Sequence, residues 1–210
     1  MENPTDRTIA QAAASSQIKP KRDLELWFEE GNLVVQAEDY QFCLFKSFLT
    51  KRSPIFKDTL SMPQPEGAER INGCPVVRIH DSGADAVHFF KAIFDPETFL
   101  PPQTGTTFEK IAAILRLSTK YEVEYLRQRA LEHLSTGYST SFLQWTIKTS
   151  ATFTALPCDA LDTIILARKV DCPWILPTAF YAYCRFANSS EIFRGTEKNG
   201  VLVSLSDADK

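Results

Sequence analysis

The spacing of apolar residues changes along the chain, and this change limits the folds that the chain can adopt. Up to residue 80, most apolar residues stand in short runs separated by turn residues, which is the pattern of strands. From residue 84 onward they recur every three or four positions, which is the pattern of amphipathic helices. Strands followed by packed helices predict an α+β fold.

The strand pattern contains one predicted hairpin. Strands are predicted at residues 24–28, 33–35, 42–45 and 75–80. The first two enclose Gly31, which is expected to supply a positive φ at a hairpin turn. In the first strand Leu24, Leu26 and Phe28 alternate onto one face, and Trp27 faces the other way. Burial in the core and burial in a protein interface both account for such a face.

Proline marks the boundary between two short helices. A helix over 47–52 must end before Pro54, because the residue that precedes proline is disfavoured in the helical region. Ser53 then fits as an N-cap with Pro54 in the first helical position, and Phe56 is expected in the core. Longer helices are predicted at residues 84–94, 107–118, 122–134, 139–149, 158–170 and 174–187.

Charge and hydropathy exclude several classes of protein. The formal net charge of the 210 residues is −3, which argues against direct binding of nucleic acid. No apolar run approaches the roughly 18 residues that would cross a bilayer, and the first twenty residues lack the apolar core of a secretory signal. We therefore expect an intracellular protein of the cytoplasm or nucleus, without membrane contact.

The sequence contains no motif that indicates catalysis. Its three histidines are His80, His88 and His133, and we expect the latter two to be solvated on helices. No nucleotide-binding motif is present, and the five cysteines lack the spacing of a disulfide framework or a zinc site. We expect no catalytic residue, no cofactor and no metal, and hence a protein that is not an enzyme.

Several segments together resemble one family of interaction domains. The run from Phe42 to Phe56, with Arg52-Ser53-Pro54-Ile55-Phe56 at its end, resembles the BTB/POZ pattern. The spacing to Val77-Arg78-Ile79 and the helix that ends in Lys120-Tyr121 also fit. The resemblance covers about residues 23–135 and is similar in detail to the BTB proteins of fungi, which share the hairpin containing Leu26-Trp27-Phe28.

The resemblance implies a fold and a domain organisation. It implies a BTB/POZ fold, a small sheet packed on a helical cluster, followed by an all-helical C-terminal extension. The expected parts are a disordered leader at residues 1–21, a BTB/POZ domain at 22–135, a helical extension at 136–187 and a polar tail at 188–210.

It also implies a function. Family members dimerise and recruit other proteins without catalysis, so the expected partners are a second copy of the chain and one unidentified protein. One alternative is a substrate adaptor of a cullin-type ubiquitin ligase, and another is a module that recruits a transcriptional corepressor. The candidate dimer interface comprises Leu24, Leu26, Trp27 and Phe28. The candidate partner surface comprises Asn32, Lys46, Phe94, Glu97 and Phe99.

Two departures from the family pattern bear on the alternatives. Corepressor-recruiting members carry an Asp where this chain has Asn32, although Lys46 keeps the basic residue that pairs with it. Cullin-binding members often show a hydrophobic-x-Glu motif after the third helix. Here Phe94 and Glu97 stand one residue further apart than that motif requires.

Overall fold

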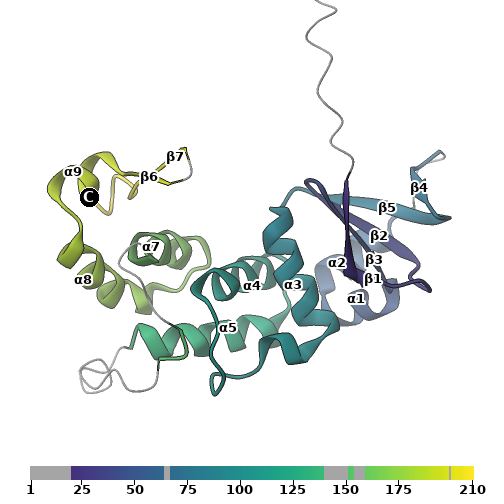
Figure 1. Cartoon of the computed structure of the whole chain (residues 1–210), viewed down its shortest axis with the longest axis horizontal. Helices are drawn as coiled ribbons and strands as arrows, with labels where there is room; N and C mark the ends of the chain where they lie inside the picture. The colour runs from purple at the N-terminus through teal and green to yellow at the C-terminus, as the bar shows by residue number, and fades with distance from the viewer. Residues whose placement is uncertain (1–19, 64–66, 140–150, 154–158, 199) are drawn as a thin grey trace, which may run out of the picture. The chain divides into compact units, whose positions relative to one another are not determined.

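The computed structural model describes residues 20–63, 67–139, 151–153, 159–198 and 200–210. The chain divides into two compact units, which we describe separately. The sheet unit holds the described residues up to Phe45 and those from 67 to 83, and the helical unit holds the other described residues (Figure 1). A fold that combines a small sheet with helices is thereby confirmed. Nearly all of the helix predicted at 139–149 and of the leader lies outside the described residues.

The sheet unit is built around a central hairpin. Its strands are β1 (Lys21–Trp27), β2 (Leu33–Ala37), β3 (Tyr40–Leu44), β4 (Arg70–Ile71) and β5 (Cys74–Ile79). Their order in the sheet is β1-β3-β2-β5-β4. Strand β2 runs antiparallel to β3, with Val34 opposite Cys43, and parallel to β5. All three central strands are rich in β-branched or aromatic residues, which suit a buried sheet.

The predicted hairpin between the first two strands is wrong. Strand β1 pairs with β3 in parallel, with Trp27 opposite Cys43, so β3 lies between β1 and β2. The hairpin joins β2 to β3 instead, and its turn contains Glu38 with φ 48°. Gly31 does not have a positive φ. It is needed for space, because a Cβ at that position would lie 2.5 Å from the Cys43 sulfur.

The predicted alternation in β1 is also wrong. Leu24 is 86% exposed, whereas Leu26 is 2% exposed. The Asp23 carboxylate accepts hydrogen bonds from the backbone N–H groups of Glu25 and Leu26, and the pairing with β3 shifts register between Arg22 and Trp27. Such an irregularity breaks the period of two that a regular strand imposes on its side chains.

Of the first two helices of the helical unit, α2 begins at the predicted residue and α1 begins one residue earlier than predicted. Helix α1 spans Lys46–Arg52 and α2 spans Pro54–Ser61. The Ser53 hydroxyl oxygen accepts a hydrogen bond from the Phe56 N–H at 3.1 Å, which confirms the predicted N-cap. Phe56 is buried, and its ring stacks on Tyr121 with centroids 4.3 Å apart.

Three longer helices and a short turn follow. They are α3 (Gly83–Phe94), the 3₁₀ turn η1 (Pro96–Phe99), α4 (Phe108–Lys120) and α5 (Glu124–Gly137). Helices α4 and α5 pack side by side, as Figure 1 shows. The helix starts of α4 and α5 lie one and two residues later than predicted, and a positive φ at Glu122 separates them.

The C-terminal segment continues the helical unit. It contains α7 (Asp159–Lys169), η2 (Pro173–Ile175), α8 (Leu176–Phe186), α9 (Ser189–Arg194), β6 (Thr196–Lys198) and β7 (Val201–Val203). Helix α7 packs on α4 and α8, and its Thr163 hydroxyl donates to the Tyr138 hydroxyl at 2.9 Å. No helix or strand was predicted for residues 188–210, where the structure has α9, capped by Asn188 and Glu191, and the strands β6 and β7. The domain boundaries expected at residues 135 and 187 stay a prediction.

Candidate functional site

The segment between α3 and α4 is held to the helices by its carbonyl groups. Three successive carbonyl oxygens, those of residues 98, 99 and 100, each accept a hydrogen bond from a side chain of α4 or α5. Lys110 donates to the carbonyl of residue 98 at 2.8 Å. Arg129 donates to that of residue 99 at 2.6 Å, and His133 to that of residue 100 at 2.8 Å. This arrangement fixes the backbone of η1 and Leu100, so the surface that η1 presents is preorganised.

His133 is the most buried of the three donors. It is 1% exposed, and its ring lies against Phe99 with centroids 4.9 Å apart. A carbonyl can only accept, so Nε2 carries a hydrogen toward Leu100, and in the neutral ring Nδ1 accepts from the Thr152 hydroxyl at 2.8 Å. Burial is the main cause of a lowered pKa for His133, and Arg129 lowers it further. The expectation that His133 is solvated is therefore wrong.

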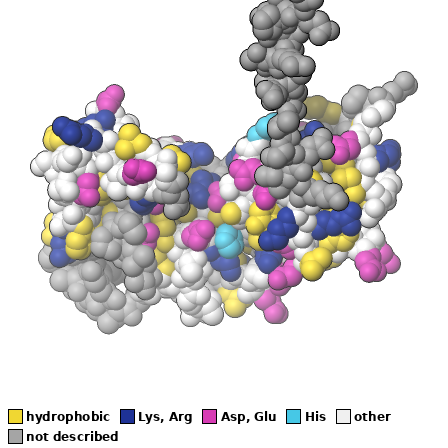
Figure 2. Space-filling view, turned by 45° about the horizontal axis from the view of Figure 1, so that its top comes forward, with side chains coloured by type: hydrophobic (Ala, Val, Ile, Leu, Met, Phe, Trp, Pro, Cys, Tyr) yellow, Lys and Arg dark blue, Asp and Glu magenta, His cyan; other side chains and the backbone are white. Residues whose placement is uncertain are grey.

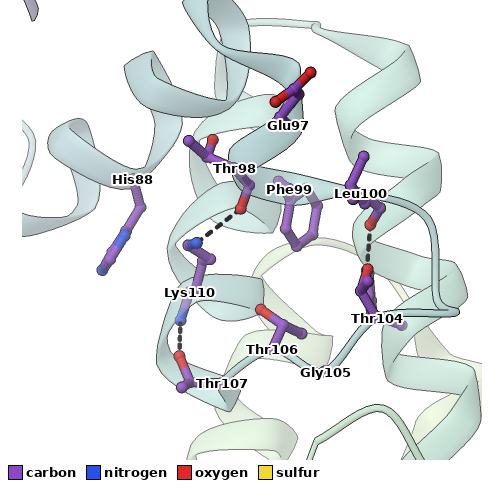
Figure 3. Close-up of a pocket in the computed structure, with 11 residues that line it drawn as sticks. His88, Glu97, Thr98, Phe99, Leu100, Thr104, Gly105, Thr106, Thr107 and Lys110 are labelled. Carbon is purple, nitrogen blue, oxygen red and sulfur yellow. Dashed lines mark hydrogen bonds between the residues drawn. The ribbon is translucent and has the colours of Figure 1, made fainter. Parts of the chain in front are cut away.

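A pocket of about 560 Å³ opens beside this held segment. Figure 3 shows it between α3, η1, the loop 104–107 and the start of α4. Its size falls within the range of about 300–1,000 Å³ that is typical of ligand sites. The residues that line it are His88, Glu97, Thr98, Phe99, Leu100, Thr104, Gly105, Thr106, Thr107, Lys110 and His133.

The electrostatics of the pocket depend on one cation and one imidazole. Lys110 contributes its ammonium group from the first turn of α4, and His88 contributes its ring from α3 (Figure 3). The pKa of His88 is lowered by burial first and by the positive charge of Lys110 second. His88 is half-buried rather than solvated, and its lowered pKa favours the neutral imidazole.

The candidate partner residues do not all gather at this site. Glu97 and Phe99 line the pocket, whereas the half-buried Phe94 packs on Phe48 with ring centroids 5.2 Å apart. Lys46 begins α1, and its Nζ donates to the carbonyl of Leu60 at 2.7 Å.

Asn32 belongs to the other compact unit. It lies in the sheet unit just before β2, is exposed, and donates its backbone N–H to the Leu44 carbonyl.

The four candidate dimer residues lie in or just after β1. Leu24 is exposed, Leu26 is buried, and Trp27 and Phe28 are half-buried. The Arg22 guanidinium lies 4.3 Å from the Trp27 ring centroid. Strand β1 is at one end of the sheet order, so within the described residues its only neighbouring strand is β3.

The pocket-forming roles of His88, Lys110 and His133 were not predicted from the sequence. Their partners lie between 12 and 33 residues away in the chain, so no local pattern signals them. One sequence signal for the pocket was the loop from Thr104 to Thr107, which ends in an N-cap residue. The structure shows this cap, because the Lys110 N–H donates to the Thr107 hydroxyl. Such a loop places polar groups at a helix start.

The described surface mixes charges of both signs. On the face shown in Figure 2, Lys and Arg side chains are interspersed with Asp and Glu. Among the described residues, no cluster of three or more His, Cys, Asp or Glu side chains is arranged to hold a metal ion. None of the helices in the described ranges has the length and apolar content needed to span a membrane. Comparison of the sequence with protein-family models and with curated proteins gives no match.

Proposed function

We propose that this chain is a non-catalytic protein–protein interaction module of the BTB/POZ type, which pairs with a second copy of itself and binds another protein. The family motifs at Phe42–Phe56 and at the end of α4 support this proposal, as does the combination of a small sheet with a helical unit. The held segment with its adjoining pocket supplies a preorganised surface for the second partner.

The observation that carries the proposal is an apolar side chain on the edge of the sheet. Leu24 is 86% exposed on β1, the strand at one end of the sheet order. An edge strand with an exposed apolar residue is a template for pairing with another chain, and proteins that do not use such an edge usually protect it. A symmetric dimer covers it twice through one two-fold axis.

Light scattering of the full chain at micromolar concentration tests self-association. We expect the mass of two chains for the unchanged protein and the mass of one chain for Leu24→Asp, because the new carboxylate would be buried in the interface. Leu202→Asp is the matched control, since Leu202 is also exposed, at 67%, but lies on β7. A single-chain mass for the unchanged protein would refute the pairing.

A cullin adaptor is the second candidate. The observation that favours it is the exposed Glu97 on η1, the turn after α3 whose Thr98 and Phe99 carbonyls accept hydrogen bonds from α4 and α5. A corepressor module has less support, because Asn32 lacks the carboxylate of that class. Calorimetric titration with a purified cullin amino-terminal domain distinguishes the two. Binding that Glu97→Lys abolishes supports the adaptor, and absence of binding by the unchanged chain rejects it.

A further inference from the structure

Lys110 is the one cation among the residues that line the pocket, and its charge is not neutralised there. Its Nζ donates to the Thr98 carbonyl at 2.8 Å, and in the described part of the chain it forms no ion pair with a carboxylate. An ammonium group has three N–H bonds to donate. Two therefore remain available to a group that enters the pocket.

The acidic groups near the pocket do not cancel this charge. Asp85 is bound by Arg116 through two hydrogen bonds of 2.7 and 2.9 Å. Glu97 is exposed, and Figure 3 shows its carboxylate directed away from Lys110. Among the neighbouring charges, Lys110 has the largest effect on the pKa of His88, which it lowers. Lys91 also lowers that pKa, whereas Glu109 and Asp85 raise it.

The walls of the pocket suit a ligand that has a hydrogen-bond acceptor at the end of a short aliphatic chain. The Thr106 and Thr107 side chains stand at the start of α4, on the same wall as Lys110, and the Thr107 hydroxyl caps the helix by accepting from the Lys110 N–H. Phe99 and Leu100 supply apolar surface on the opposite side. Donors on one wall and apolar surface on another are what an acidic amino-acid side chain requires.

From these observations we infer that the pocket binds an Asp or Glu side chain of the partner protein, whose carboxylate accepts hydrogen bonds from Lys110. The inference rests on the proposed function, since it names the chemistry by which the second partner is recognised. A bound carboxylate would also stabilise the imidazolium form of His88 and raise its pKa.

The test is a titration of the full chain with two neutral-ended tripeptides, acetyl-Ala-Glu-Ala-amide and acetyl-Ala-Gln-Ala-amide, followed by the NMR signals of the His88 ring. We expect saturable shifts with the Glu peptide and binding at least about tenfold weaker with the Gln peptide, because a charge-assisted hydrogen bond is lost. The pKa of His88 should rise only when the Glu peptide is bound.

Three variants make the test specific to this pocket. Lys110→Gln should weaken binding of the Glu peptide at least about tenfold, and Glu97→Gln should strengthen it, because a repelling charge is removed. Lys57→Gln, on the exposed face of α2, should leave it unchanged.

Two results would overturn the inference: equal binding of the two peptides, or no binding of either. The test does not depend on self-association, so a chain that is monomeric by light scattering and still binds the Glu peptide refutes only the pairing. A chain that dimerises without binding the peptide refutes only the pocket.

Discussion

The Nε2 atom of His133 lies 2.8 Å from the carbonyl oxygen of Leu100, and this contact joins α5 to the segment that follows η1. On its other side the ring contacts the Thr152 hydroxyl, so one imidazole connects three segments that are distant in sequence. Both ring nitrogens are satisfied in the neutral form, which makes His133 a structural element of the pocket wall.

Replacing His133 with phenylalanine should destabilise the fold. The ring is kept in shape, but the Leu100 carbonyl and the Thr152 hydroxyl lose a partner in a buried place. We expect the free energy of unfolding to fall by about 1–3 kcal/mol, as measured by urea denaturation. His80→Phe is the control, because His80 is exposed and should change stability little. Equal effects of the two substitutions would contradict the structural role.

Stability should depend on pH through His88 and His133. Burial lowers the pKa of both in the folded chain, whereas the unfolded value is about 6.5. The unfolded chain therefore binds more protons in this range. The contribution of the two residues to stability is complete above about pH 6.5 and is lost as the pH falls below it. Urea denaturation between pH 5 and 8 should show this decline, and it should be shallower in His133→Phe. An unchanged slope in that variant would show that His133 does not contribute.

Truncation of Phe56 should be among the most costly changes in the helical unit. Its ring stacks on Tyr121 and also contacts Phe90, with centroids 6.2 Å apart. Phe56→Ala should lower the free energy of unfolding by about 3–5 kcal/mol, because it leaves a cavity among aromatic rings. Phe193→Ala provides the comparison, since Phe193 is 61% exposed on α9. Thermal unfolding at the same temperature for both variants would mean that Phe56 is not part of the core.

A chain that ends at Ser135 should be less stable than the full chain and should aggregate. Helix α7 packs on α4, and Tyr138 and Phe153 are buried beside Phe108, so removal of residues 136–210 exposes apolar surface on α4. The expected result is a lower melting temperature and loss of soluble protein on heating, measured by calorimetry and light scattering. A soluble short chain with an unchanged melting temperature would show that the C-terminal segment folds on its own.

The sequence determined those features that depend on neighbours in the chain. The start of α2 follows from Ser53 and Pro54, since an N-cap acts on an N–H three residues away. The burial of Phe56 follows from helical spacing, because the apolar face of a helix repeats with its turns. The central strands were predictable from short apolar runs such as Leu33-Val34-Val35, because a run of this kind between turn residues is typical of a buried strand.

The tertiary structure alone decided which segments meet. Strand β1 pairs with β3 and not with β2, although β2 is nearer in sequence, and the short turn after Trp27 does not reveal this choice. His133 is buried because Leu100 and Thr152 offer it partners, whereas a helix pattern places it only beside polar neighbours. The physical reason is the same in both cases. A backbone or imidazole hydrogen bond gives nearly the same stabilisation with any well-placed partner. Which partner a donor or acceptor takes therefore depends on which groups the packing of the whole chain brings within about 3 Å.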